Sequence, residues 1–237
     1  MFNTKIPLYG LAIICALISN VIVVIILYKK YHFNRDEMIG ALVYENIGII
    51  FGAKLLTYLQ DISHYGKFDI YTLGLSSFGG VIGAIICLIL FGLQFKKSLK
   101  EMMFLFMPSI PLMYSIGKVG CFLVGCCYGI EYNGIGNVVY NYSFSAPVGV
   151  HLFPVQIIET VVFLCIFVYM FIKQKYCKFN WNTLGISFCM CGLGKFILDY
   201  FRNGHAVIIV SLNQIISLIF VIIGLFLIYK KENNIKE

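Results

Sequence analysis

The chain contains apolar stretches of about 20 residues, the length that an α-helix needs to cross a hydrocarbon layer of about 30 Å. Of its 237 residues 60% are hydrophobic and only 12% are charged, whereas soluble domains carry about 25% charged residues. These proportions exclude a soluble enzyme, a disordered chain and a disulfide-stapled secreted module. We therefore expect an all-α polytopic membrane protein with a single integral membrane domain over residues 1–237. The seven expected spans cover residues 7–28, 38–60, 73–95, 102–124, 155–172, 183–201 and 207–229.

The formal net charge is +7, and most of the basic residues lie in the connections between these spans. Twelve of the 18 Lys and Arg residues fall in alternate connections or in the C-terminal tail, whereas the opposite connections hold only Lys5, Lys67 and Arg202. The positive-inside rule then predicts an N-terminus outside and a cytoplasmic C-terminus. The excess of basic residues is therefore explained by membrane topology, and no nucleic-acid partner is expected. The first span is longer than a signal-peptide core and lacks a cleavage site, so we expect it to be retained.

Six ionisable residues lie within the expected spans, where each costs at least about 2.5–3.5 kcal/mol. They are Glu45, Lys54, Lys118, Glu159, Lys195 and Asp199. All except Glu45 fall in the outer half of the membrane, beside a long outer connection at about 125–154. This distribution favours a pocket open to the outer leaflet over an ion conduit and over separate ion pairs with snorkelling lysines. Three ammonium groups suit a phosphate, so a lipid head group is the expected ligand.

The segment GKVGCFLVGCCYG, between residues 117 and 129, resembles the signature G-R-x-G-N-F-x-N-x-E-x-x-G of the prolipoprotein diacylglyceryl transferases. Lys118 stands at the position of the signature arginine. Shorter segments resemble other elements of the same family, in the same order along the chain. They are PLYG at 7–10, GAKL at 52–55, LSSFGG at 75–80, PVQIIE at 154–159, GKFILDYFR at 194–202 and QIIS at 214–217.

The resemblance implies seven helices and a transferase that moves the diacylglyceryl group of phosphatidylglycerol to the lipobox cysteine thiol of prolipoproteins. Its expected partners are phosphatidylglycerol or a similar anionic phospholipid, and prolipoprotein signal peptides. Its expected location is the bacterial plasma membrane (the cell inner membrane), with the active site facing the outer leaflet. No metal and no soluble cofactor are implied.

The same resemblance assigns the candidate site residues. Lys118 and Lys195 would hold the phosphate as catalytic residues, while Glu159 and Asp199 would orient these lysines and one of them would accept a proton. The expected substrate-binding residues are Tyr9, Lys54, Gly79, Gly80, Cys121, Cys126, Arg202 and Gln214. Two alternatives stay open: Tyr9 as an aromatic anchor at the membrane interface, and the paired glycines as a helix-packing face.

Phe78 and Phe153 stand where the family has histidines, and the first of these is the usual candidate for activating the thiol. Phenylalanine cannot accept or donate a proton, so another residue would have to act as the general base. The candidates are Glu159, Asp199, His151 and His205. Two alternative functions follow. One is a divergent paralogue that acts on another lipid or acceptor, and the other is a non-catalytic lipid-binding membrane protein.

Three cysteines lie in the signature segment, Cys121, Cys126 and Cys127. A C-x4-C-C spacing without a nearby histidine is poor for zinc, which prefers paired ligands two to four residues apart. We expect a structural thiol or a disulfide, with a reactive thiolate beside Lys118 as the alternative. Five further cysteines are expected to be small apolar fillers within spans: Cys15, Cys87, Cys165, Cys189 and Cys191.

Overall fold

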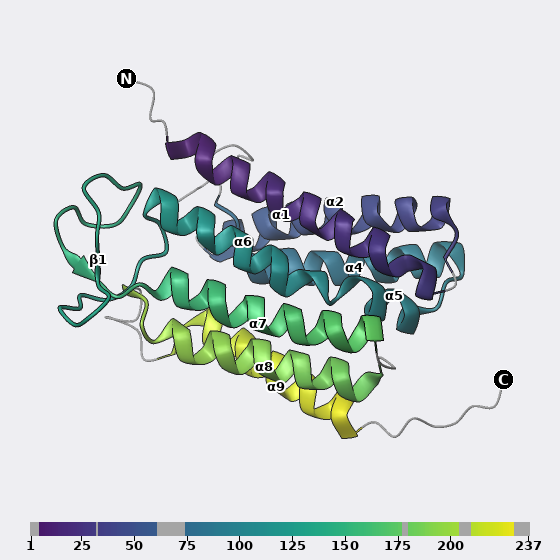
Figure 1. The fold of residues 1–237 in the computed structure, drawn as a ribbon. Coiled ribbons are helices and arrows are strands. Elements are labelled where there is room, and N and C mark those ends of the chain that lie inside the picture. The colour runs from purple at the N-terminus through teal and green to yellow at the C-terminus, as the bar shows by residue number, and fades with distance from the viewer. Residues whose placement is uncertain (1–4, 32, 61–73, 177–179, 204–209, 230–237) are drawn as a thin grey trace. The chain divides into compact units, whose positions relative to one another are not determined.

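The structure is a computed structural model that describes residues 5–31, 33–60, 74–176, 180–203 and 210–229 (Figure 1). Seven helices in this part of the chain are long and apolar enough to cross a membrane, which confirms the prediction of a helical polytopic membrane protein. The elements are α1 (Lys5–Leu27), the 3-10 helix η1 (Tyr28–Lys30), α2 (Arg35–Gln60), α4 (Ser77–Phe95), α5 (Leu99–Phe106), α6 (Ser109–Val124), β1 (Val138–Val139), β2 (His151–Leu152), α7 (Val155–Tyr176), α8 (Trp181–Asp199) and α9 (Leu212–Tyr229).

The chain forms two compact units, a first unit of residues 1–19 and 111–237 and a second unit of residues 20–110. Helix α1 begins in the first unit and ends in the second, and α6 begins in the second unit and continues into the first. The first unit therefore contains α7, α8 and α9, and the second contains α2, α4 and α5.

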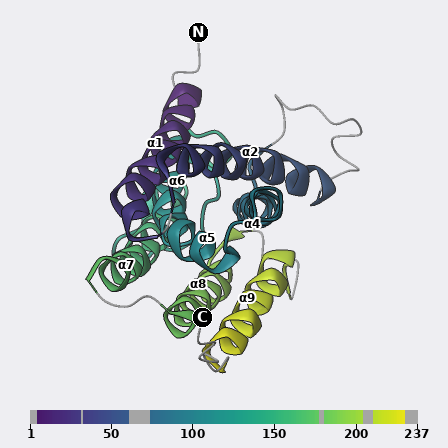
Figure 2. The same cartoon turned by 90° about the vertical axis from the view of Figure 1, so that its right-hand side faces the viewer.

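In the second unit α2 and α4 lie side by side (Figure 2). Gly48 and Gly52 on α2 meet Gly83 and Gly79 on α4, and a Cβ atom added at any of the four would overlap the backbone of the partner helix. Small residues allow such close approach of two helix backbones in a membrane. Gly79 therefore serves helix packing, one of the two readings that the sequence left open.

The fourth span is interrupted near its cytoplasm-facing end in the predicted topology. Instead of one helix over 102–124, α5 ends at Phe106 and α6 begins at Ser109. Pro108 lies between them and has no N–H to continue the helical hydrogen bonds. The Ser109 hydroxyl donates to the carbonyl oxygen of Phe106 at 2.7 Å, which satisfies one backbone acceptor at the break.

Glu45, the ionisable residue nearest the middle of a span, is fully buried in the second unit. Its Oε2 accepts a hydrogen bond from Nδ2 of Asn20 on α1 at 2.7 Å. Oδ1 of Asn20 in turn lies 2.6 Å from the Ser109 hydroxyl. A polar network thus joins α1, α2 and the start of α6 inside this unit.

In the first unit α7, α8 and α9 lie side by side (Figure 1). Helix α9 begins at Leu212 rather than at the predicted residue 207, and residues 207–209 lie outside the described part of the chain. Helices α8 and α9 approach closely at Gly185 and Gly224, where an added Cβ would crowd the partner backbone. This packing fixes the N-terminal end of α8 beside the C-terminal end of α9.

The long connection at 125–154 is folded rather than slack. Strands β1 and β2 pair antiparallel, with Val138 opposite Leu152 and Val139 opposite His151. Tyr140, Ala146 and Leu152 form a small buried core beneath them. The connection therefore has a defined structure at the end of α6 and the start of α7.

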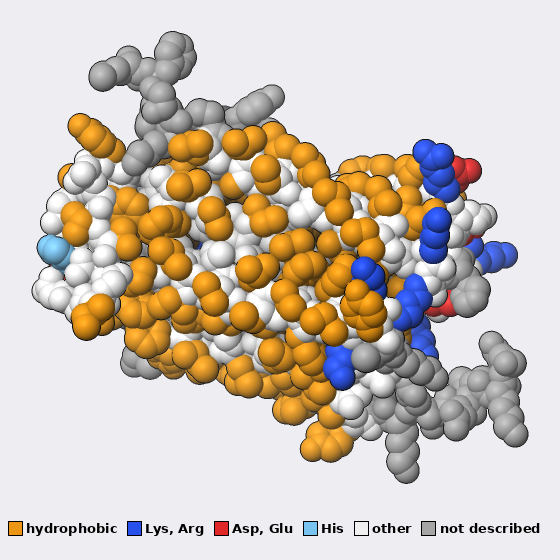
Figure 3. Space-filling model, viewed as in Figure 1, with side chains coloured by type: hydrophobic (Ala, Val, Ile, Leu, Met, Phe, Trp, Pro, Cys, Tyr) orange, Lys and Arg blue, Asp and Glu red, His pale blue; other side chains and the backbone are white. Residues whose placement is uncertain are grey.

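The outward faces of the helices carry large apolar side chains. Ile14 on α1, Val168 on α7 and Phe226 on α9 are all exposed. Figure 3 shows hydrophobic side chains over the helices on the face turned to the viewer. Exposed apolar area of this extent on long helices is the pattern of a protein surrounded by lipid.

Candidate active site

Three helices of the first unit bring together the charged residues that the sequence places far apart. Nζ of Lys118 on α6 lies 2.7 Å from Oε2 of Glu159 on α7. Nζ of Lys195 on α8 lies 2.5 Å from Oε1 of the same carboxylate. One glutamate thus bridges two lysines, and we call these three residues together with Tyr114 the charged cluster.

The charged cluster is withdrawn from solvent. Glu159 is 0% exposed, Lys195 3% and Lys118 7%. Charged groups are retained in such surroundings when they are paired and hydrogen-bonded, because an isolated ion there would carry a large desolvation cost. The predicted role of Glu159, orienting the two lysines, therefore agrees with its contacts.

Tyr114 completes the cluster and was not among the residues predicted from the sequence. It lies four positions before Lys118, hence on the same face of α6. Its hydroxyl donates to Oε1 of Glu159 at 2.8 Å. The centre of its ring lies 5.2 Å from Nζ of Lys118 and 5.5 Å from Nζ of Lys195, within range of cation–π attraction. A polar residue inside an apolar span, one turn from a lysine, is the feature that could have identified it.

Ser115 and Thr160 connect α6 and α7 at the level of the cluster. The Ser115 hydroxyl donates to the carbonyl oxygen of Thr160 at 3.0 Å. The Thr160 hydroxyl lies 2.8 Å from the carbonyl oxygen of Gln156 on its own helix and 3.4 Å from that of Ser115. These bonds satisfy side-chain hydroxyls within the apolar span and fix the positions from which Lys118 and Glu159 extend.

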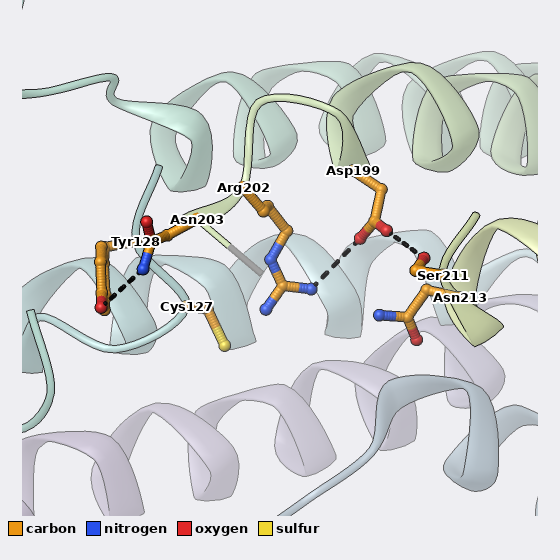
Figure 4. Close-up of a pocket in the computed structure, with 7 residues that line it drawn as sticks. All are labelled: Cys127, Tyr128, Asp199, Arg202, Asn203, Ser211 and Asn213. Carbon is orange, nitrogen blue, oxygen red and sulfur yellow. Dashed lines mark hydrogen bonds and ion pairs between the residues drawn. The ribbon is translucent and has the colours of Figure 1, made fainter. Parts of the chain in front are cut away.

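A second polar group lies where α8 ends and α9 begins. Nη1 of Arg202 lies 3.5 Å from Oδ1 of Asp199, and the Ser211 hydroxyl donates to Oδ2 of Asp199 at 2.5 Å (Figure 4). Asp199 is buried, and it thus links the end of α8 to the start of α9 through two different partners. The sequence predicted that Asp199 orients the lysines; the contacts described here are to Arg202 and Ser211, so the role toward the lysines stays a prediction.

Gln214 contributes to the start of α9. Its Oε1 accepts from the backbone N–H of Ser211 at 3.1 Å, and the Ser211 hydroxyl accepts from the backbone N–H of Gln214 at 3.1 Å. This reciprocal arrangement is a capping box, which satisfies donors at a helix N-terminus. Nε2 of Gln214 is buried and makes no hydrogen bond with the described residues, so it remains a donor for a ligand.

Asp199, Arg202 and Ser211 border a pocket with a volume of about 440 Å³ (Figure 4). Arg202 lies between Cys127 on one side and Asp199 on the other, with Ser211 and Asn213 beyond the aspartate. The remaining lining residues are Tyr128 and Asn203. Burial tends to lower the pKa of the Arg202 guanidinium, but the nearby acidic groups of Cys127 and Glu159 outweigh burial and raise that pKa above its usual value. The pocket therefore has a permanent cation on its wall.

The backbone beside this pocket is formed by three segments in close contact. The N–H of Ile130 donates to the carbonyl oxygen of Phe201 at 3.0 Å, and the N–H of Phe153 donates to the carbonyl oxygen of Ile130 at 2.9 Å. Gly129 sits between them, where an added Cβ would overlap the carbonyl oxygen of Phe153 and lie 3.0 Å from that of Phe201. Only glycine fits this position, and it brings Arg202 next to the signature segment.

The structure also brings the three signature cysteines together. The Sγ atoms of Cys121, Cys126 and Cys127 all lie within 4.8 Å of one another, and all three thiols are free. Hydrogen bonds from Cys121 and Cys126 hold the pKa of the Cys127 thiol well below its usual range, with Lys118 and Arg202 acting in the same direction. Hydrogen bonding to both neighbours, together with burial, raises the pKa of the Cys126 thiol.

The predicted site residues fall into two sets. The first unit holds Tyr9, Cys121, Cys126, Lys118, Glu159, Lys195, Asp199, Arg202 and Gln214. Tyr9 belongs to the packing of α1 on α6, because a Cβ added at Gly120 would lie 3.5 Å from its ring. Lys54, Gly79 and Gly80 belong to the second unit, so their part in the site remains a prediction.

The two phenylalanines at the family's histidine positions are packing residues. Phe153 stacks on Phe201 with ring centres 4.9 Å apart, and Phe78 is buried on α4. Of the histidines considered as bases, His151 lies on β2 with Nδ1 2.8 Å from Oδ1 of Asn137. His205 lies outside the described residues.

The fold and these contacts define a multi-pass membrane protein with two buried lysines and a pocket lined by an arginine, an arrangement suited to an anionic group. The family model described as prolipoprotein diacylglyceryl transferase matches residues 1–230. The chain therefore belongs to the prolipoprotein diacylglyceryl transferase family, whose members are transferases of lipoprotein biosynthesis.

Similarity to individual members extends over nearly the whole chain. The phosphatidylglycerol–prolipoprotein diacylglyceryl transferase of Clostridium tetani is 30% identical over 95% of this chain and 93% of its own length. The phosphatidylglycerol–prolipoprotein diacylglyceryl transferase 2 of Clostridium perfringens is 28% identical over 97% of this chain and 92% of its own. An enzyme of the same name from Dehalococcoides mccartyi is 40% identical over 54% of this chain and 51% of its own.

Proposed function

We propose that the protein transfers the diacylglyceryl group of phosphatidylglycerol, or of a similar anionic phospholipid, to the cysteine thiol of a prolipoprotein signal peptide. The sulfur forms a bond to the terminal glyceryl carbon, the bond from that carbon to the phosphate oxygen breaks, and glycerol phosphate leaves. The observation that carries the proposal is the buried bridge from Lys118 through Glu159 to Lys195, in a chain of this family.

The charge balance of the site supports an anionic ligand. Lys118, Lys195 and Arg202 are three cations, whereas Glu159 and Asp199 are two carboxylates. When these five are ionised and the Cys127 thiol keeps its proton, one unit of positive charge is left for a ligand to neutralise. Fixed cations near the leaving phosphate would stabilise the charge that develops on its oxygens as the carbon–oxygen bond breaks.

The pocket beside Arg202 would hold the phosphate-bearing head group. Arg202 supplies a planar guanidinium that can bind phosphate oxygens in pairs, a geometry that lysine lacks. Gln214 supplies the buried Nε2 donor described above. Tyr9, Lys54, Gly79, Gly80, Cys121 and Cys126 are proposed as further substrate-binding positions.

Asp199 is the favoured acceptor of the thiol proton. It lines the pocket, whereas Glu159 is fully buried and committed to two lysines and a tyrosine. The thiol must lose its proton to become a strong nucleophile. A carboxylate that borders the pocket can take that proton directly or through one water molecule.

The proposed topology places the N-terminus outside, the C-terminus in the cytoplasm and the site at the outer leaflet of the bacterial plasma membrane. Residues 1–237 would then form a single integral membrane domain. Within the first unit, Lys173 and Lys175 lie in the last turn of α7, whereas Glu159 lies near its start. Basic residues at one end of the helix and the charged cluster at the other agree with the positive-inside rule.

Complementation of a strain depleted of its own transferase would test this function. Wild-type protein should restore prolipoprotein lipidation, read as the mass increase of a reporter lipoprotein. Lys118→Ala should abolish that increase, and Lys173→Ala, at the opposite end of the first unit, should preserve it. Equal membrane abundance of both variants is the required control. A full mass increase with Lys118→Ala would contradict the proposed phosphate-binding role.

A further inference from the structure

The three signature cysteines are gathered by the way α6 ends. Gly125 adopts the left-handed conformation, with φ of +70°. The N–H of Cys126 donates to the carbonyl oxygen of Cys121 at 3.0 Å, and the N–H of Gly125 donates to that of Phe122 at 3.3 Å. These two bonds define a Schellman motif, in which the residue after the left-handed glycine returns to the residue five positions earlier. The C-x4-C spacing therefore brings Cys121 and Cys126 side by side.

Cys127 is directed to the same place by a second unusual backbone conformation. Its φ is +52°, which is uncommon for a residue other than glycine. Such conformations persist when the surroundings hold them, and they concentrate at functional sites. The result is a three-thiol cluster, Cys121, Cys126 and Cys127, with all Sγ atoms within 4.8 Å of one another.

Neighbouring segments hold this turn from two sides. Nε2 of Gln156 on α7 donates to the carbonyl oxygen of Cys126 at 2.9 Å. The carbonyl oxygen of Gly125 accepts from the backbone N–H groups of Ser145 and Ala146 at 3.3 and 3.0 Å. A Cβ at Gly125 would also lie 2.7 Å from Cβ of Ser143. The backbone hydrogen bonds of this turn form without any ligand, and the turn therefore holds the three thiols in place.

We propose that Cys121, Cys126 and Cys127 form a binding site for a divalent thiophilic cation of the Zn²⁺ class. Soft thiolate ligands select such cations. A Zn–S distance of about 2.3 Å places tetrahedral sulfurs about 3.8 Å apart, so no pair of the three Sγ atoms needs to close by more than about 1 Å. Three protein ligands with an open fourth position is an established zinc geometry. Cys127 borders the pocket, which leaves that fourth position accessible to water or another small ligand.

The charges around the cluster suit a divalent ion. Binding releases the three thiol protons, and three thiolates with one divalent cation carry a single negative charge. Lys118 and Arg202 both lie within electrostatic range of Cys127. They would offset that charge. The proposal does not depend on the lysine–glutamate bridge, although it uses Cys121 and Cys126, which are also proposed above as substrate-binding positions.

Titration of purified full-length protein with Cd²⁺, under reducing conditions in detergent, tests the site. Thiolate–Cd²⁺ coordination gives a near-ultraviolet charge-transfer band, which we expect to saturate at one equivalent and to fall when Zn²⁺ is added. Cys126→Ser and Cys127→Ser should each weaken binding at least tenfold. Cys165→Ser, an exposed cysteine on α7, is the matched control and should bind as the wild type does.

Two results would overturn the proposal. One is the absence of the charge-transfer band in reduced wild-type protein, which needs no variant to interpret. The other is a band of unchanged intensity in the Cys126→Ser and Cys127→Ser double variant. Mass spectrometry of protein isolated without reductant provides an independent readout. A disulfide between any two of the three cysteines in cells would assign them to a covalent structural role instead.

Discussion

Lys118 and Glu159 form an ion pair of 2.7 Å between α6 and α7, and both residues are buried. The same carboxylate holds Lys195 from α8. Because a single glutamate neutralises one of the two lysines but contacts both, its removal would leave two buried cations without a counter-ion. The cluster therefore links the stability of three helices to the chemistry of the site.

Glu159→Gln should destabilise the protein and abolish lipidation. Breaking a buried ion pair by removing one partner costs about 3–5 kcal/mol. We expect a clearly lower thermal unfolding midpoint of the purified protein in detergent. Glu131→Gln, at an exposed position of the 125–154 connection, should leave both properties unchanged. An unaltered midpoint for Glu159→Gln would mean that the bridge does not contribute to stability.

Tyr114→Phe should have a smaller and more selective effect. The substitution removes the hydrogen bond to Glu159 and keeps the ring beneath both lysines. Hydrogen bonds to charged groups contribute about 1.5–3 kcal/mol, and 1.4 kcal/mol in a barrier is about a tenfold rate change. We expect a roughly tenfold lower lipidation rate in membranes from cells expressing the variant. Tyr229→Phe, at an exposed position on α9, is the control; equal rates for the two variants would count against this role.

Gly129→Ala should disrupt the backbone contacts that position Arg202. The added methyl group would overlap the carbonyl oxygen of Phe153, which belongs to the backbone and cannot move aside as a flexible side chain can. We expect faster proteolysis of the 125–154 connection and loss of lipidation. Gly10→Ala on α1 adds the same methyl group in open space and should be tolerated. If both variants resist protease equally, the close approach at Gly129 is not required.

Alkaline titration should report on the folded 125–154 connection through Tyr140. Burial and the neighbouring Cys126 raise the pKa of Tyr140 to about 12. Since an unfolded tyrosine ionises near pH 10, the folded state keeps its proton where the unfolded state has lost it. The stability that this proton contributes is therefore complete below about pH 10 and is lost as the pH rises toward 12.

The measurement is the difference in tyrosinate absorbance between wild type and Tyr140→Phe across pH 9–12.5. We expect the tyrosine isolated by this difference to ionise near pH 12. Ionisation near pH 10 would show that the Tyr140 hydroxyl is accessible to water, in conflict with its hydrogen bond to the carbonyl oxygen of Phe122 at 3.2 Å.

The apolar spans and the charged residues within them were predictable from the sequence, for one physical reason. A lipid environment penalises both short apolar segments and unpaired charges, so length and charge carry most of the information. The sequence therefore identified Lys118, Glu159 and Lys195 as buried charges, but it did not show that Glu159 pairs with both lysines. Pairing depends on the rotation of three helices about their axes, which spacing along one chain does not determine.

Other features depend on local geometry that residue spacing did not convey. The break at Pro108 follows from one missing N–H within an otherwise continuous apolar span. The grouping of Cys121 with Cys126 follows from a helix ending at Gly125, whereas rules for zinc ligands compare spacing alone. Ser211 belonged to an S-x-x-Q pattern with Gln214, which was visible in the sequence but not interpreted as a helix cap.

The glycine contact between α2 and α4 has a consequence for how a lipid reaches the protein. The two backbones are in direct contact at Gly48, Gly52, Gly79 and Gly83. An acyl chain therefore cannot pass between α2 and α4 at these positions. A diacyl phospholipid donor would therefore have to enter between other helices. The lipidated prolipoprotein would have to leave between other helices as well. Larger side chains at these glycines would separate α2 from α4. Such variants would show whether close packing of the two helices is needed to exclude membrane lipid.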